Sequence, residues 1–280
     1  MSAISNFFAD LMSYHFLQNA VVTGLVIGLV SGVIGCFIVL RGMSMMRDAI
    51  SHAVLPGVAV SYLLGMNFLI GAVVFGMLAA VSVTYIRENS IIKGDTAIGI
   101  TVSAFLALGV ILIGLVNSST DLFHIIFGNI LAVQDVDKYL TIVVSFVVLV
   151  VIWLFYKELL VTSFDPVFAK SVGMKVNRYH YLLMLLLSVV SVTAMQSVGT
   201  ILIIALLITP AASSYLYVNN LKQMMLLSSL FGVFSSLAGI FIGYTYNIAV
   251  GSTIVLVATL LFAVSFVIAP KGILRKKDIS

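Results

Sequence analysis

Long stretches without a charged side chain dominate the chain and predict its membrane-crossing helices. The first runs unbroken from Phe16 to Leu40. It is long enough to cross a bilayer once, because a transmembrane helix needs about 20 apolar residues. Two further single crossings are expected at Thr96–Thr120 and Tyr139–Tyr156. This pattern is typical of helical membrane proteins, in which each span pairs its own backbone polar groups.

Three longer charge-free stretches must each fold back once, because each is too long for a single crossing. Each contains glycine or polar residues typical of a turn. The stretches and their expected turns are Ala53–Ile86 with a turn at 65–67, Tyr181–Leu221 with a turn at 198–199, and Gln223–Pro270 with a turn at 243–247. We therefore predict an all-α, polytopic membrane bundle over residues 16–270, with nine transmembrane helices, or eight if one stretch is re-entrant.

Charge predicts the orientation of this bundle. Under the nine-span count, Lys138 is the one basic residue on a face that otherwise collects Asp121, Asp135 and Asp137. All other lysines and arginines fall on the opposite face, which the positive-inside rule makes cytoplasmic. The N-terminal segment 1–15 is then extracellular or interfacial, and the tail 271–280 is cytoplasmic.

Two connecting segments have a character of their own. Residues 121–137 are too polar for lipid and too apolar for a free loop, so Phe123–Leu131 predicts a short re-entrant helix. An interfacial helix is the alternative. His124 with Asp121 is a candidate metal pair at the outer face, ranked below the pair described next. The longest cytoplasmic loop, 157–180, is too short to be an enzyme.

Asp48 and His52 place a carboxylate and an imidazole one helical turn apart. Apolar residues follow at once, so the pair sits at or within the bilayer, where ionisable groups are costly and mark ion or proton pathways. These ligand types suit Mn, Fe, Co or Zn. The structural alternative is an aspartate that complements the helix dipole beside a packed histidine. Two side chains do not fill a six-coordinate shell, so we predict half of a metal site.

Two prolines inside predicted helices release backbone carbonyl groups. Pro56 has no N–H, so the carbonyl of His52 loses its helical partner beside the candidate pair. Broken helices with free carbonyls recur at transporter midplanes, and a plain kink is the alternative. Thr209-Pro210 repeats the device by freeing the carbonyl of Leu206, where a close-packing seam is the alternative. We predict that Pro56, Thr209 and Pro210 form gates or hinges.

The cytoplasmic loop contains a short capped helix. Asp165-Pro166 is typical of an N-cap followed by proline at the first helical position, and Gly173 is typical of the residue just past a helix end. Such a helix either lies on lipid headgroups or docks a cytoplasmic partner. The local sequence favours neither.

Composition narrows the class of function. Apolar residues make up 62% of the chain and charged residues 9%, which is too little polar surface for a soluble domain. The small basic excess lies on one membrane face and argues against nucleic-acid binding. The single cysteine, Cys36, excludes an internal disulfide. No G-x-x-x-x-G-K-[ST] motif is present, so nucleotide hydrolysis would belong to another subunit. No permanently bound cofactor is expected.

In order and spacing, the motifs resemble those of the integral-membrane permeases of manganese, zinc and iron ABC importers. The resemblance covers nearly the whole chain and is strongest to the manganese permeases of streptococci and similar Gram-positive bacteria. It differs at Ser213-Ser214, where family members often have Thr or Ala. The residues that carry it are Arg41-Gly42-Met43-Ser44 with Asp48–Gly57, then Phe164–Gly173, and then Val198-Gly199-Thr200 through Pro210-Ala211-Ala212.

The resemblance implies a type II ABC importer permease in a bacterial plasma membrane. It implies a homodimer, a cytoplasmic ATPase and an extracellular metal-binding lipoprotein as partners. Asp48 and His52 would line the metal path, and the ATPase would dock around Asp165, Pro166, Ala169 and Gly173. The expected function is Mn(II) import by alternating access, with Zn(II) or Fe(II) as alternative substrates. A secondary transporter or channel that needs no ATPase is the other alternative.

Overall fold

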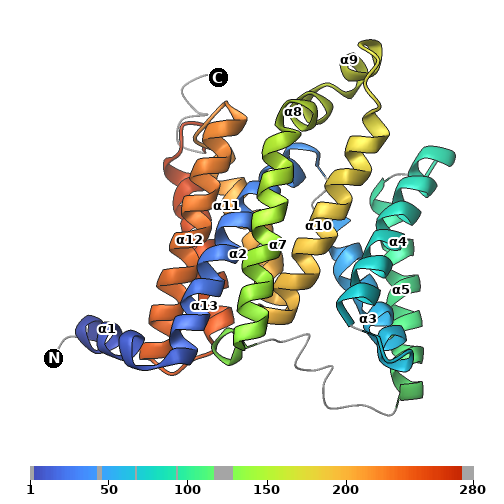
Figure 1. Ribbon diagram of the computed structural model, residues 1–280. Helices are drawn as coiled ribbons and strands as arrows, with labels where there is room; N and C mark the ends of the chain where they lie inside the picture. Colours follow the sequence, from blue (N-terminus) through green and yellow to red (C-terminus); the bar gives the residue numbers. More distant parts are fainter. Residues whose placement is uncertain (1–2, 43–45, 67, 93, 117–128, 273–280) are drawn as a thin grey trace. The chain divides into compact units, whose positions relative to one another are not determined.

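The computed structural model describes residues 3–42, 46–66, 68–92, 94–116 and 129–272, and within these ranges the chain is helical, with no strand (Figure 1). Seven helices have the length and apolar character of membrane spans. They are α2 (His15–Leu40), α4 (Phe68–Asn89), α5 (Gly94–Val116), α7 (Asp135–Leu154), α10 (Val176–Val198), α12 (Leu221–Thr245) and α13 (Val250–Ile268).

Two shorter apolar helices complete the set, and each contains a proline. They are α3 (Met46–Leu63) with Pro56 and α11 (Thr200–Tyr215) with Pro210. Together with the seven longer helices they confirm, over the described residues, the prediction of eight or nine spans. The remaining short elements are α1 (Ala3–Ser13), the 3-10 helix η1 (Ile130–Ala132), α8 (Tyr156–Phe164) and α9 (Pro166–Ser171).

The predicted turns lie at or beside the helix breaks, although α12 continues to Thr245 and covers the first part of the turn predicted at 243–247. Gly65, between α3 and α4, has φ +64°, and Gly199, between α10 and α11, has φ +84°. Glycine adopts this left-handed region without the steric cost that a side chain brings. Asn247 takes φ +51° between α12 and α13, and asparagine is among the few other residues that tolerate it.

Two segments differ from the sequence prediction. The helix expected from Tyr139 begins at Asp135, because Asp135 and Asp137 suit the positive end of the helix dipole in its first turn. The loop predicted at 157–180 contains α8 as well as α9, and α10 already starts at Val176. Residues 117–128 lie outside the described part, so the re-entrant helix over Phe123–Leu131 stays a prediction.

The chain forms two compact units. The first comprises residues 1–40, 124–151 and 194–280, and the second comprises residues 41–123 and 152–193. The division falls inside α7 and α10.

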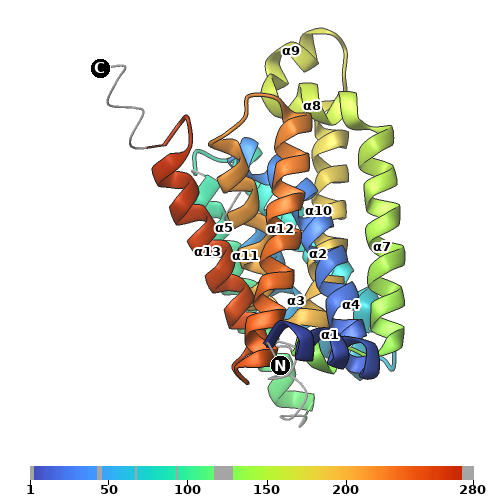
Figure 2. The same cartoon turned by 90° about the vertical axis from the view of Figure 1, so that its left-hand side faces the viewer.

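In the first unit, α2 packs closely against α12 and α11 (Figures 1 and 2). Small residues permit this approach: a Cβ built on Gly28 would lie 2.7 Å from the carbonyl oxygen of Gly232, and one on Gly32 would lie 2.6 Å from the amide nitrogen of Ser229. Membrane helices associate through such small residues because lipid offers no hydrophobic drive between them.

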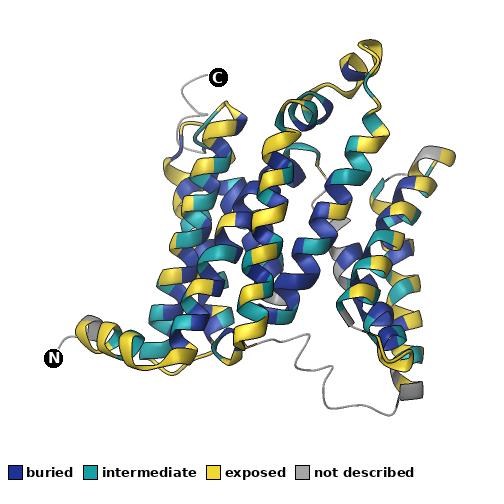
Figure 3. Ribbon diagram, viewed as in Figure 1, coloured by how far each residue is buried: buried dark blue, intermediate teal, exposed yellow. Residues whose placement is uncertain are grey.

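The outer side of α12 is exposed and apolar. Leu226, Leu230 and Phe234 recur at a spacing of four residues and are each more than half exposed (Figure 3). An apolar stripe of this kind suits contact with lipid tails.

In the second unit, α3 packs against both α4 and α5. Gly57 of α3 meets Gly71 of α4 backbone to backbone, so neither position has room for a side chain. Ile50 of α3 lies near Gly76 of α4, and Ser188 of α10 approaches the same glycine. This packing fixes the helix that carries the predicted metal pair.

Candidate functional site

The predicted metal pair lies in the first two turns of α3. The helical backbone places Asp48 and His52 one turn apart on the same side of the helix. The His52 side chain is half-buried. The side chain of Asp48 lies outside the described part of the structure, as do His124 and Asp121 entirely.

Helix α5 lies along the side of α3 that carries the pair. A Cβ built on Gly109 of α5 would lie 3.0 Å from Leu55 Cβ and from Pro56 Cδ. Leu55 and Pro56 follow His52 by three and four residues and therefore share its side of the helix. Pro56 is buried inside α3, so the carbonyl released at His52 belongs to the same local packing.

Metal ligands beyond this pair are scarce. Nowhere in the described ranges do three or more His, Cys, Asp or Glu side chains gather closely enough to hold an ion. An ion held by Asp48 and His52 would therefore need carbonyl groups, water or a second protein copy to fill its shell.

The second predicted hinge belongs to the first unit. Pro210 is buried inside α11, and Gly35 of α2 lies directly against the carbonyl of Leu207 one turn earlier. The Ser213 hydroxyl donates to the carbonyl of Thr209 at 2.8 Å, and the Ser214 hydroxyl donates to Ala211 at 2.8 Å. The two serines that depart from the family pattern thus bond to the backbone of their own helix.

The predicted coupling residues form one capped helix, α9. Asp165 is its N-cap, and its Oδ1 accepts a hydrogen bond from the amide of Phe168 at 2.8 Å. Pro166 opens the helix, Ala169 is buried, and Gly173 ends the motif with φ +80°. Both ends of this short helix are thereby fixed.

The exposed side of α9 is apolar, in keeping with the apolar residues of the predicted capped helix. Val167 is 78% exposed, Phe168 54% and Val172 60%. Apolar side chains gathered on a polar-flanked helix are typical of a protein or membrane contact.

A partly buried polar network beside α9 was not predicted from the sequence. Arg41 Nε donates to Ser163 Oγ at 2.8 Å, and Nη2 donates to Thr162 Oγ1 at 3.0 Å. Arg41 Nη1 lies 3.4 Å from His180 Nδ1, and His180 Nε2 lies 3.2 Å from Thr84 Oγ1. Burial lowers the pKa of Arg41 to about 10, so the guanidinium is still a cation at neutral pH. The sequence predicted Arg41 to be one of the basic residues on the cytoplasmic face and part of a family motif, but it did not predict these partners.

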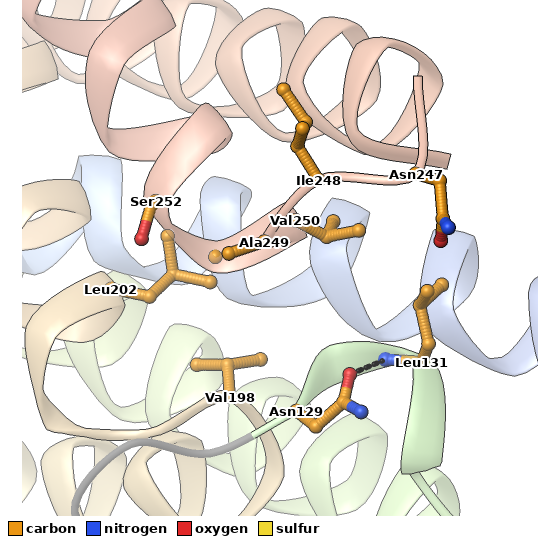
Figure 4. A pocket seen from close by; sticks show the side chains of 10 residues that line it. Asn129, Leu131, Val198, Leu202, Asn247, Ile248, Ala249, Val250 and Ser252 are labelled. Atoms are coloured by element: carbon orange, nitrogen blue, oxygen red, sulfur yellow. Dashed lines mark hydrogen bonds between the residues drawn. The ribbon is translucent and has the colours of Figure 1, made fainter. Parts of the chain in front are cut away.

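A pocket of about 400 Å³ opens in the first unit between η1, the start of α11 and the α12–α13 connection (Figure 4). Its wall contains amide, hydroxyl and apolar groups, and none of the described residues that line it carries a carboxylate, imidazole or thiol. It therefore lacks the usual ligands of a transition metal. The lining residues are Asn129, Leu131, Val198, Leu202, Asn247, Ile248, Ala249, Val250, Gly251 and Ser252.

Known proteins match this chain over nearly its whole length. Residues 13–269 match the family described as the ABC 3 transport family. The manganese import system permease protein ScaB of Streptococcus gordonii is 63% identical over 99% of both chains. The manganese transport system membrane protein MntC of Listeria monocytogenes is 55% identical over 97% of both.

Two solved structures share the fold. The structure of PsaBC from Streptococcus pneumoniae in complex with Fab has a chain that is 64% identical, with a TM-score of 0.88, covering 96% of this chain and 97% of that chain. A metal-chelate type ABC transporter in an inward-facing conformation is 17% identical, with a TM-score of 0.69, covering 89% of this chain and 84% of that one. At that identity the second likeness shows the fold alone.

Proposed function

Because this chain belongs to the ABC 3 transport family, we propose that it is the membrane permease of an ATP-driven importer of Mn(II). The observation that carries the proposal is the match to manganese import permeases over 99% of both chains at 63% identity. A permease of this kind carries the ion and leaves ATP hydrolysis to a partner chain, in keeping with the missing P-loop motif.

The metal path runs past Asp48 and His52 in this proposal. The carboxylate and the imidazole supply one oxygen and one nitrogen ligand, and Mn(II) prefers a six-coordinate, oxygen-rich shell. The His52 carbonyl freed by Pro56, water and a second copy of the chain in a homodimer are the sources we propose for the rest. Zn(II) and Fe(II) accept the same two ligands, so selectivity lies in the geometry of the completed shell.

Transport proceeds by alternating access in a permease of this type. The two proline-containing helices, α3 and α11, are the elements we propose to bend, because each lacks one backbone hydrogen bond next to tightly packed glycines. Pro56 is the hinge beside the metal pair, and Thr209 and Pro210 form the second hinge.

A cytoplasmic ATPase docks on α9 in the proposed complex. The capped helix offers Val167, Phe168 and Val172 as an apolar contact surface. A rigid helix with exposed apolar side chains transmits force better than a free loop. A metal-binding lipoprotein delivers the ion at the opposite membrane face.

The charge distribution of the first unit supports the proposed orientation. Lys271 donates to backbone carbonyls at the end of α11, whereas Asp10 of α1 bonds Tyr244 at the end of α12. Lys271 therefore lies at the C-terminal end of this unit, whereas the opposite end carries Asp10, Asp135 and Asp137 with one lysine, Lys138. By the positive-inside rule the C-terminus is cytoplasmic and the N-terminus is extracellular.

Complementation tests this function directly. A bacterium that lacks its own manganese importer receives this chain with its ATPase and lipoprotein, and uptake of radioactive Mn(II) is measured with Zn(II), Fe(II) or Co(II) as competitor. We expect restored uptake that excess unlabelled Mn(II) suppresses most strongly. No uptake of radioactive Mn(II), together with uptake of radioactive Zn(II) or Fe(II), would identify that other metal as the substrate.

A further inference from the structure

We propose that Arg41 is a positioning residue that joins the ATPase-docking helix α9 to the metal-bearing helix α3. The inference rests on the proposed function, because it takes α9 as the docking site of the ATPase. Arg41 is not one of the proposed metal ligands, and it lies outside α9.

Arg41 holds both chain segments that flank α9. Thr162 and Ser163 end α8, immediately before the Asp165 cap, and they accept two hydrogen bonds from the guanidinium. His180 lies in the first turns of α10, which follows α9. One planar side chain therefore ties the entry and the exit of α9 together, a geometry that the rigid fork of arginine suits and a flexible lysine does not.

The network has a fixed direction. Arginine only donates hydrogen bonds, so His180 Nδ1 must accept, and the proton of the neutral ring is then on Nε2. That N–H donates to the hydroxyl of Thr84, which in turn donates to the carbonyl of Ala80 at 2.8 Å. The chain of donors thus runs from Arg41 through α10 into α4.

Removing the Arg41 guanidinium from water costs free energy, and this cost favours a functional role for the residue over a purely structural one. Among the residues that the structure describes, the partners of the Arg41 guanidinium are two hydroxyls and a histidine ring, and no carboxylate forms an ion pair with it. Burying a cation against neutral groups is unfavourable relative to an apolar side chain of the same size. If the residue only held these segments together, an apolar side chain packed in its place would do so at a lower free-energy cost.

Two routes lead from Arg41 to the metal pair. Arg41 directly follows α2 and precedes the start of α3 by five residues, so its position constrains where α3 begins. Thr84 lies on α4, which packs backbone to backbone on α3 where Gly57 meets Gly71. A displacement of α9 by the ATPase therefore reaches α3 through the connecting chain and through α4.

The test measures how many Mn(II) ions are imported per ATP hydrolysed by the complete permease–ATPase complex in liposomes. Arg41→Met has nearly the same length but no donors. We expect it to assemble with the ATPase and to hydrolyse ATP within about twofold of the unmodified complex, and to import about tenfold fewer ions per ATP. Arg41→Lys should import a number of ions per ATP between those of Arg41→Met and the unmodified complex, because one ammonium group replaces the planar guanidinium.

Ser82→Ala is the matched control. The Ser82 hydroxyl bonds the carbonyl of Leu78 within α4, outside the network, and its removal should leave the ion-to-ATP ratio unchanged. If Arg41→Met fails to assemble, Thr162→Val combined with Ser163→Ala removes two partners and leaves the arginine in place. This double variant should also lower the ratio.

An unchanged ratio in an assembled Arg41→Met complex, or in the double variant, would overturn the inference. Loss of import and of ATP hydrolysis in the same proportion would overturn it as well, because that is the effect of lost folding or docking. Failure of the unmodified complex to import Mn(II) with ATP contradicts the proposed function instead, so the two failures are distinguishable.

Discussion

Asp48 and His52 place a carboxyl group and an imidazole on the side of α3 that faces α5. In the proposed path, a metal ion that passes them would exchange part of its water shell for these groups. The carbonyl released at Pro56 adds a third polar group within one turn. Elsewhere in the described residues, no group of three or more carboxylate, imidazole or thiol side chains could hold a metal ion.

Replacing either member of the pair should therefore block transport. We predict that Asp48→Asn and His52→Ala each lower Mn(II) uptake by at least about tenfold, the smallest effect usual for groups that support a metal site. Asp48→Asn keeps the shape of the side chain and loses only its charge. Uptake assays on membranes with equal amounts of permease check this.

Asp95→Asn serves as the control, since Asp95 is exposed in the first turn of α5 and lies outside the proposed path. It should leave uptake unchanged. A packed, structural pair would give the opposite result: reduced thermal stability of both variants with uptake per folded molecule preserved.

Asn19 is a second residue whose role follows from its contacts. Its side chain is buried, donates to Asp135 Oδ1 at 3.1 Å and accepts from Lys138 Nζ at 2.8 Å. We predict that Asn19→Ala lowers the free energy of unfolding by about 1–3 kcal/mol, because it leaves the side-chain amine of Lys138 with one fewer partner in a largely buried position.

A thermal melt of the detergent-solubilised protein checks this prediction. Ser13→Ala removes an exposed hydroxyl at the end of α1 and should leave the melting temperature unchanged. Equal melting temperatures for Asn19→Ala and the unmodified protein would contradict the assigned role.

Among the helices, the contact between α3 and α4 depends on the absence of side chains. Gly57 and Gly71 bring the two backbones together, whereas Gly99 of α5 has no atom within 4 Å of a built Cβ. Gly57→Ala should therefore separate the helices and destabilise the protein, while Gly99→Ala should be neutral or stabilising by up to about 1 kcal/mol through helix propensity.

Parallel thermal melts of the two variants test this contrast. The same chemical change occurs in both, so the difference isolates the close approach of α3 and α4. A Gly57→Ala variant as stable as Gly99→Ala would contradict the prediction, because it would show that α3 and α4 accommodate a methyl group at their contact.

The spans were predictable because lipid imposes a simple rule of about 20 apolar residues per crossing. Glycine and asparagine then placed the turns at Gly65, Gly199 and Asn247, where the backbone takes positive φ. The α8 helix was missed because Lys157 and Glu158 interrupt its apolar pattern. The start of α7 was missed because its aspartates read as loop residues, although they favour a helix N-terminus.

The candidate site was only partly predictable. The spacing of Asp48 and His52 on one helix follows from the sequence, because helical periodicity is local. The partners of Arg41 do not, because Thr162, Ser163 and His180 lie more than 120 residues along the chain and only the fold brings them together. The spacing of serine and threonine along the sequence does not distinguish Thr162 and Ser163 from the other hydroxyl residues of the helices.

The whole molecule is proposed to sit with its C-terminus in the cytoplasm. The single native cysteine, Cys36, is fully buried, so cysteines introduced elsewhere report on their own positions. We predict that a membrane-impermeant maleimide labels Ile248→Cys in intact cells and labels Lys175→Cys only after the cells are opened. Both side chains are exposed.

Labelling of the protein before and after permeabilisation gives each cysteine its own control. Rapid labelling of Lys175→Cys in intact cells would place α9 outside, where no ATPase can reach it. That result would overturn the orientation and the coupling scheme together.

In the proposed function, this chain passes Mn(II) only when a partner ATPase hydrolyses ATP. Purified permease is reconstituted in liposomes alone and together with its ATPase, lipoprotein and ATP, and Mn(II) movement across the membrane is measured. We predict movement only in the complete system, abolished by Asp48→Asn. Equal Mn(II) movement by the permease alone would contradict the account and identify a channel or secondary transporter.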